Sequence, residues 1–182
     1  MEKHLALWME EQTQRYAQNV DGAVVCPTEK WSSNVKQRWK TFRVKRWQIN
    51  LNNVNDFCTK NNQVPKVNGT TYHEQQLARW MEEQGAIYNK ASQKPSEKFT
   101  GEMKSNWQHF VENRWNMIAA KVDKFILDNG KIPNPNSTTW PEKYYAEWIN
   151  IQKTNFQDRK EAMKLKAVRD EWSNYNVKWN VQ

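Results

Sequence analysis

Two stretches of the chain, WQINLNNVNDFCTKNNQVP at residues 47–65 and WNMIAAKVDKFILDNGKIP at residues 115–133, carry one pattern 68 positions apart. Each begins with Trp and ends with Asn and an aliphatic-Pro pair. The apolar residues of the first stretch recur at helical spacing: Trp47, Leu51, Val54 and Phe57. Such spacing predicts one apolar face of an α-helix, and the Asn and Val-Pro that follow are typical of a helix end. The pattern therefore predicts a repeat that contains an amphipathic helix from about Trp47 to Lys60.

The same register extends upstream of both tryptophans. The matched positions are Trp31, Val35, Trp39 and Phe42, which align with Phe99, Met103, Trp107 and Phe110, and a shortened third copy reads Val168, Trp172 and Tyr175, followed by Trp179. A second pattern recurs three times: Leu5, Trp8, Gln12 and Tyr16; then Leu77, Trp80, Gln84 and Tyr88; then Tyr145, Trp148, Gln152 and Phe156. Both patterns have helical spacing.

These patterns predict an all-α protein made of tandem three-helix bundles with Trp-rich cores. One complete unit has helices at about 47–60, 73–88 and 96–114, and Pro141 suits the first turn of a helix. The predicted divisions are residues 1–46, 47–114 and 115–182. Residues 1–46 form an incomplete repeat because they supply only the second and third helices. We expect its uncovered apolar face to be covered by the neighbouring unit or by a partner chain.

The repeat resembles the helicase-associated domain family. The resemblance is carried by Leu-x-x-Trp-x-x-x-Gln-x-x-x-Tyr, by a Trp-bearing third helix, and by Trp-x6-Val-x2-Phe before Asn and Val-Pro. That family is a tandem three-helix module found at the ends of bacterial helicases and in algae and large DNA viruses. The resemblance implies nucleic-acid binding, a large DNA virus as a source, and a nuclear or viral replication compartment. No GxxxxGK[ST] loop is present, so no helicase motor is expected.

Composition excludes several other classes of protein. Eleven Trp residues argue against a disordered chain, although the mean hydropathy is −1.08. No apolar run approaches the roughly 20 residues of a membrane span, and no signal-peptide core is visible. The two cysteines, Cys26 and Cys58, suit a reducing compartment, so we expect an intracellular, non-secreted protein.

The sequence offers no recognisable catalytic set, metal site or cofactor motif, and its three histidines are scattered: His4, His73 and His109. The chain is therefore expected not to be an enzyme.

Positive charge is concentrated in one predicted helix. Residues 30–46 hold seven of the 28 Lys and Arg residues and no acidic residue, while the whole chain has a net charge of +8. The predicted nucleic-acid-binding residues are Lys36, Arg38, Lys40, Arg43, Lys45 and Arg46, with Lys30 at the edge of the cluster. Trp31, Val35, Trp39 and Phe42 are expected to form the buried stripe of this helix. An amphipathic cationic helix of this kind can approach a phosphate backbone and release counterions.

Other interpretations of the charge remain open. The basic helix could be a solvated face, a surface for a protein partner, or a nuclear import signal. A second basic set is weaker because acidic residues are interleaved with it: Arg159, Lys160, Lys164 and Lys166, with Arg169 nearby.

Two expectations concern the repeated aromatic and amide residues. The tryptophans of the repeat are expected in the core, with Trp39, Trp107 and Trp172 as the clearest cases, and Trp31 and Trp140 as the candidates for exposure. Gln12, Gln84 and Gln152 lie on the aromatic side of their helices, and each is expected to form a structural hydrogen bond to a loop backbone.

The sequence thus predicts a non-enzymatic nucleic-acid-binding protein with low sequence specificity, DNA being favoured over RNA. The alternative is a structural or protein-interaction module, associated with a virion or with chromatin, that self-assembles as a homodimer or with a protein partner.

Overall fold

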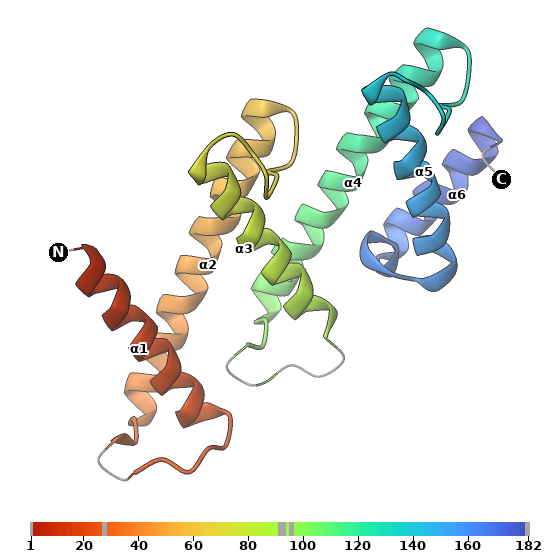
Figure 1. Cartoon of the computed structure of the whole chain (residues 1–182). Coiled ribbons are helices and arrows are strands. Elements are labelled where there is room, and N and C mark those ends of the chain that lie inside the picture. The colour runs from red at the N-terminus through yellow and green to blue at the C-terminus, as the bar shows by residue number, and fades with distance from the viewer. Residues whose placement is uncertain (1, 27–28, 91–93, 95–96, 181–182) are drawn as a thin grey trace. The chain divides into compact units, whose positions relative to one another are not determined.

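The computed structural model describes residues 2–26, 29–90, 94 and 97–180. These residues form helices and no strand, so the all-α prediction is confirmed (Figure 1). The elements in chain order are α1 (Glu2–Val20), α2 (Ser33–Asn61), α3 (Tyr72–Asn89), α4 (Gly101–Asn129), α5 (Trp140–Asp158), the short 3-10 helix η2 (Glu161–Lys164) and α6 (Lys166–Trp179).

The chain divides into two compact units, Met1–Ser105 and Asn106–Gln182, and the division falls inside α4. Unit 1 contains α1, α2, α3 and the start of α4. Within it, α1 lies beside the first half of α2 and α3 lies beside the second half (Figure 1). Unit 2 contains the remainder of α4 together with α5, η2 and α6.

The structure joins helices that the repeat pattern predicts as separate. Helix α2 runs without interruption through Arg46 and Trp47, and α4 runs through Arg114 and Trp115. Neither junction contains Gly or Pro, so nothing in the local sequence ends the helix there. The third helix of the second repeat, expected from Ser96, begins at Gly101 instead.

The helix ends follow local capping chemistry. The hydroxyls of Ser32, Thr71 and Thr100 accept hydrogen bonds from backbone N–H groups three residues ahead, which satisfies a donor that the first turn leaves unpaired. Asn62 caps the C-terminal end of α2 and adopts the left-handed conformation that Asn tolerates. Pro141 lies in the first turn of α5, as predicted.

Three tryptophans in mutual contact form the centre of unit 2. Trp115 of α4 packs against Trp148 of α5 with ring centroids 5.7 Å apart, and Trp148 meets Trp172 of α6 edge-on at 6.2 Å. Val122 and Met163 are fully buried around them. In unit 1, Trp47 of α2 packs against Trp80 of α3 as Trp115 packs against Trp148, with ring centroids 5.9 Å apart. The core is therefore rich in tryptophan in the complete repeats, as the sequence predicts.

A buried hydrogen bond accompanies each of these tryptophan pairs. The indole N–H of Trp47 donates to the Gln84 amide oxygen at 2.9 Å, and the indole N–H of Trp115 donates to Gln152 at 3.1 Å. The prediction that these glutamines make structural hydrogen bonds is correct, but their partner is an indole and not a loop backbone. Each bond satisfies a buried donor and a buried acceptor at once and fixes the register between two helices.

Replacing Gln152 with Ala is expected to lower the free energy of unfolding by about 1–3 kcal/mol, because it leaves the Trp115 indole N–H buried without an acceptor. Urea titration followed by far-ultraviolet circular dichroism measures the change. Gln12→Ala is the matched control: Gln12 is only half-buried, so we expect a loss below about 0.5 kcal/mol. Equal losses in the two variants would contradict this account of the glutamines.

Candidate nucleic-acid interface

The first half of α2 carries the basic residues that the sequence analysis predicts as a binding site. Arg38, Lys40, Lys45 and Arg46 are exposed, while Lys36 and Arg43 are half-buried. Among the described residues, none of the six pairs with a carboxylate. Six positive charges therefore lie on three turns of one helix without a carboxylate partner, four of them exposed, and they form what we call the basic surface.

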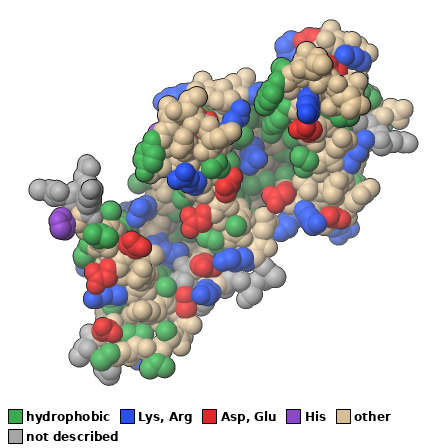
Figure 2. Space-filling model, in the orientation of Figure 1, with side chains coloured by type: hydrophobic (Ala, Val, Ile, Leu, Met, Phe, Trp, Pro, Cys, Tyr) green, Lys and Arg blue, Asp and Glu red, His purple; other side chains and the backbone are tan. Residues whose placement is uncertain are grey.

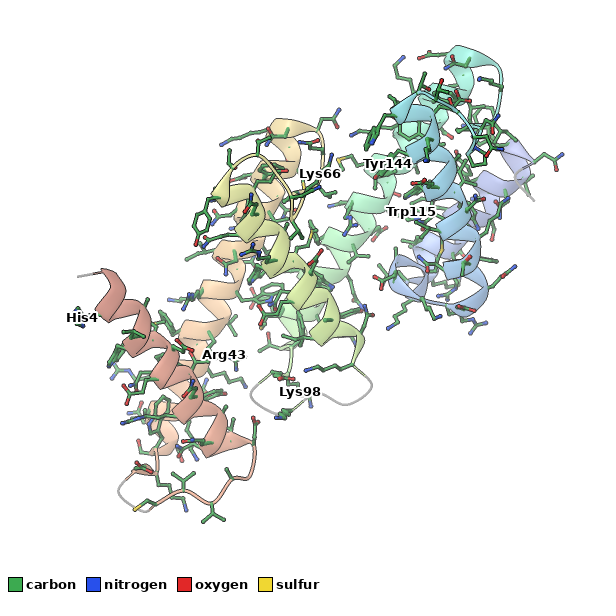
Figure 3. All side chains as sticks on the ribbon, in the orientation of Figure 1. His4, Arg43, Lys66, Lys98, Trp115 and Tyr144 are labelled. Atoms are coloured by element: carbon green, nitrogen blue, oxygen red, sulfur yellow. The ribbon has the colours of Figure 1, made fainter. Side chains whose placement is uncertain are left out.

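Arg43 has a second role at this site. Its guanidinium lies 5.2 Å from the centre of the Tyr16 ring, so it reaches across from α2 to α1 (Figure 3). Such a cation–π contact contributes about 0.5–1 kcal/mol at a partly exposed site. Arg43 is consequently part of the packing between the two helices as well as part of the basic surface.

The Asn19 side chain links the end of α1 to the residues that precede α2. The Asn19 amide oxygen accepts the backbone N–H of Trp31 at 2.7 Å, and its amide nitrogen donates to the Glu29 carbonyl at 3.3 Å. This bridge fixes the start of α2 against the end of α1. The basic surface therefore lies on a positioned helix.

The expected buried stripe of this helix is wrong in part. Trp39 and Trp31 are half-buried and contact each other at 5.7 Å, but Val35 and Phe42 are exposed. The spacing identifies the apolar face correctly, but nothing in the described residues covers it fully. Hydrophobic side chains accordingly reach the surface among charged ones in the α1 and α2 region (Figure 2).

The weaker basic set differs in its surroundings. Lys160 pairs with Asp158 and Lys166 pairs with Asp170, each at 2.6 Å. Arg159 forms the left-handed end of α5, Arg169 donates to two backbone carbonyls, and Lys164 is exposed within η2. Most of this set therefore serves local structure or is neutralised, and it makes a poorer phosphate-binding surface than the first half of α2.

The predicted positions of the other tryptophans are confirmed in three cases. Trp107 and Trp172 are buried in the core, and Trp140 is exposed at the start of α5. Trp140 stacks on Tyr144 with the ring planes 7° apart and the centroids separated by 5.1 Å. Trp39, expected in the core, is only half-buried.

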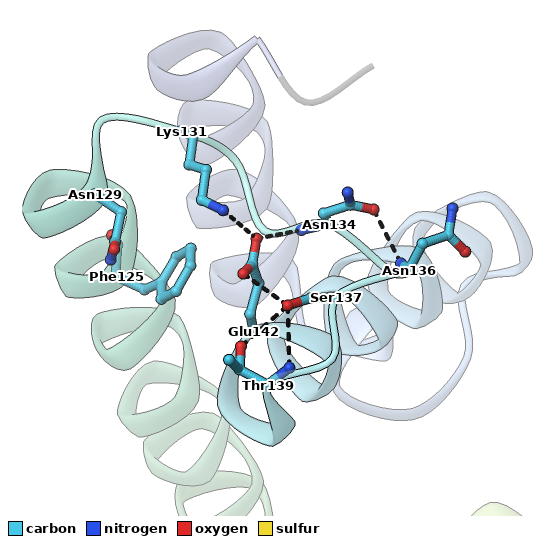
Figure 4. Close-up of polar contacts among 8 residues, drawn as sticks. All are labelled: Phe125, Asn129, Lys131, Asn134, Asn136, Ser137, Thr139 and Glu142. Atoms are coloured by element: carbon cyan, nitrogen blue, oxygen red, sulfur yellow. Dashed lines mark hydrogen bonds and ion pairs between the residues drawn. The ribbon is translucent and has the colours of Figure 1, made fainter.

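A cluster of polar contacts joins the loop between α4 and α5 to Glu142 in the first turn of α5 (Figure 4). The Glu142 carboxylate accepts the backbone N–H of Asn134 at 3.1 Å, the Ser137 hydroxyl at 2.8 Å, and the Lys131 ammonium at 2.8 Å. The hydrogen bonds from Lys131 and Ser137 hold the pKa of Glu142 below its ordinary value of 4.5.

The equivalent residue 68 positions earlier makes the same kind of contact. Glu74 accepts the backbone N–H groups of Lys66 and Thr70, each at 3.2 Å, and a Cβ at Gly69 would collide with its carboxylate. Repetition of this arrangement in two loops indicates a structural clamp and not a catalytic site. The apolar repeat pattern does not reveal this clamp, but the Thr-x-x-Glu spacing of a capping box marks both sites, at Thr71–Glu74 and Thr139–Glu142.

No group of three or more His, Cys, Asp or Glu side chains that could hold a metal ion occurs in the described part of the chain. Nor is any helix in that part long and apolar enough to cross a membrane.

Comparison of the chain with protein-family models, with characterised proteins and with solved structures found no match.

Glu142→Gln is expected to weaken the dependence of stability on acid. A lowered folded-state pKa means that the ionised carboxylate stabilises the native state above pH 4.5, and that this contribution is lost as the pH falls through the folded-state pKa. Thermal unfolding at pH 7 and at pH 3 measures the effect. The wild-type protein should lose more stability between these two pH values than the Gln variant, and the same loss in both would contradict the clamp.

Proposed function

We propose that the chain is a non-enzymatic nucleic-acid-binding protein that contacts DNA phosphates through the basic surface of α2 with low sequence specificity. The observation that carries the proposal is the set of six basic residues between Lys36 and Arg46 with no carboxylate partner among the described residues. Phosphate contacts give affinity and position but carry no direct sequence information, so a surface of this composition favours sequence-tolerant binding.

The dimensions of the helix support phosphate contacts. An α-helix rises 1.5 Å per residue, so the basic surface extends over about 15 Å. Duplex DNA carries one negative charge for about every 1.7 Å of its axis, so several phosphates lie within reach of long Lys and Arg side chains. The positioned α1–α2 packing keeps these charges on a formed helix before binding, which lowers the entropy lost on association.

The resemblance to the helicase-associated domain is a second line of support. A large DNA virus as the source, and the nucleus or a viral replication compartment as the place of action, are parts of the proposal that rest on this resemblance alone. The basic surface itself is independent of the resemblance, because it follows from the charges and their surroundings.

The second candidate function is a structural or protein-interaction role. It is favoured by the exposed apolar side chains of α1 and of the first half of α2, which a monomeric protein seldom gathers on one face. The two functions are compatible, because α2 exposes both basic and apolar side chains.

Substitution of Arg38 and Lys40 by Glu is expected to weaken binding to duplex DNA at least about 10-fold at low salt, and to reduce the salt slope of log K by about 2. Both residues are exposed, and neither makes the Tyr16 contact that Arg43 makes. Fluorescence anisotropy at about 50 and 200 mM salt measures both quantities. Duplex DNA, single-stranded DNA, duplex RNA and single-stranded RNA should be compared in the same buffer.

The control is Lys98→Glu with Lys143→Glu, which changes the net charge equally at two exposed lysines outside both basic sets. We expect this variant to retain most of the affinity. If both double variants lose affinity equally, binding reflects net charge and not the basic surface. If the wild-type protein binds none of the four ligands, the proposed function is wrong.

A further inference from the structure

The α1–α2 pair exposes residues whose counterparts are buried elsewhere in the chain. Leu5 is 62% exposed while Leu77 is 6% exposed, and Trp8 is 50% exposed while Trp148 is 7% exposed. On α2, Val35 is 44% exposed and Phe42 is 40% exposed. Their counterparts in α6, Val168 and Tyr175, are 1% and 6% exposed. We call Leu5, Trp8, Val35 and Phe42 the open face.

Unit 2 shows which element covers this face in a complete repeat. The second half of α4, Trp115–Asn129, packs across α5 and α6. Its contacts are Trp115 with Trp148 and Gln152, Phe125 with Tyr145 at 5.7 Å, and Asp123 with Lys178 at 2.8 Å. One helix thus supplies a tryptophan, an aspartate eight residues later and a phenylalanine ten residues later.

Four receiving residues have a counterpart at the open face. A fifth, Trp179, donates its indole N–H to Asp123 at 2.6 Å, and Arg46 stands at the equivalent position of α2. Trp8 takes the place of Trp148, Gln12 that of Gln152, and Leu5 that of Tyr145. Lys45 follows Phe42 by three residues, as Lys178 follows Tyr175.

The arrangement of the tryptophans that would contact a covering helix is also present at the open face. Trp8 meets Trp39 at 6.3 Å and 76°, and Trp148 meets Trp172 at 6.2 Å and 82°. The open face is therefore built as in unit 2, but no helix in the described part of the chain covers it. The Trp39 indole N–H is buried without an acceptor in the described part of the chain, which is consistent with unfinished packing.

We propose that the open face binds an amphipathic helix of another protein, which supplies a tryptophan to Trp8 and Gln12, an acidic residue to Lys45 and a phenylalanine to Leu5. Charge complementarity favours an acidic partner, because the six basic residues of α2 lie beside this face. We expect the partner helix to resemble the covering helix of unit 2, with a single apolar stripe and one carboxylate at the edge of that stripe.

A second copy of this chain is a poorer occupant. Its own helices of this pattern are already buried, since Trp47, Val54, Trp115 and Val122 are each at most 6% exposed. Donating one of them would require its own core to open. Pairing two open faces directly would instead bring two basic surfaces together, which like-charge repulsion opposes.

A labelled peptide of residues 115–129 is the probe for this site, titrated with the full-length chain and followed by fluorescence anisotropy. Saturable binding is expected. Trp115→Phe in the peptide keeps an aromatic ring but removes the indole N–H, so affinity should fall about 5-fold through loss of one buried hydrogen bond. Asp123→Lys in the peptide should also weaken binding, because it places a like charge against Lys45.

Two variants of the chain locate the site. Leu5→Glu places a charge in the open face and should weaken peptide binding at least about 10-fold. Leu7→Glu is the matched control, because Leu7 is equally exposed on the same helix but lies outside the repeated pattern. It should bind the peptide as the wild-type chain does. Circular dichroism of both variants checks that the helices are intact.

Three results would overturn the proposal. The first is absence of saturable binding up to about 1 mM peptide. The second is equal loss of binding in Leu5→Glu and Leu7→Glu, which would place the peptide elsewhere. The third is a dimer of the wild-type chain, seen by sedimentation, that Leu5→Glu converts to a monomer, because a second copy would then occupy the face. The nucleic-acid proposal is tested separately. Arg38→Glu with Lys40→Glu should leave peptide affinity within about 3-fold of the wild-type value, because the 115–129 peptide has equal numbers of Lys and Asp residues.

Discussion

The contact between a tryptophan of one helix and a tryptophan and glutamine of the next is the interaction on which each complete repeat depends. Large aromatic rings bury much apolar surface, but an indole also brings an N–H group that must find an acceptor when it is buried. Gln84 and Gln152 meet that requirement for Trp47 and Trp115. Packing and hydrogen bonding therefore select the same helix register, which a core of aliphatic residues alone would define less sharply.

The incomplete repeat shows how much depends on the covering helix. Trp8, Trp39 and Gln12 are all present, and the two rings take nearly the same mutual orientation as Trp148 and Trp172. The neighbouring aliphatic residues nevertheless stay exposed. Two helices can thus set the arrangement of the rings, but the third is needed to remove the apolar surface from water, where most of the stabilisation arises.

Much of the fold is predictable from the sequence, because tryptophans at helical spacing recur in three copies of the pattern. The pattern correctly predicts the buried Trp107 and Trp172, the exposed Trp140 and the helix end near Asn61. It fails at Val35 and Phe42, because periodicity identifies an apolar face without showing whether anything covers it. The repeat pattern also places a boundary inside the unbroken α2, because a pattern marks where a repeat begins, whereas a helix ends only where its hydrogen bonding or backbone conformation is interrupted. For the candidate site, the sequence locates the basic residues but cannot show that Arg43 contacts Tyr16 or that Lys160 and Lys166 are paired.

The continuity of α2 has a consequence for its basic half. Starting a helix is unfavourable, because several residues must be ordered before the first hydrogen bond forms, whereas extending an existing helix adds one bond for each residue ordered. The second half of α2 is anchored by the buried Trp47, Leu51 and Val54. The half that carries Arg38 and Lys40 therefore needs only propagation from an ordered template. A segment dense in like charges, which would be a weak helix by itself, acquires its conformation from the unit that follows it.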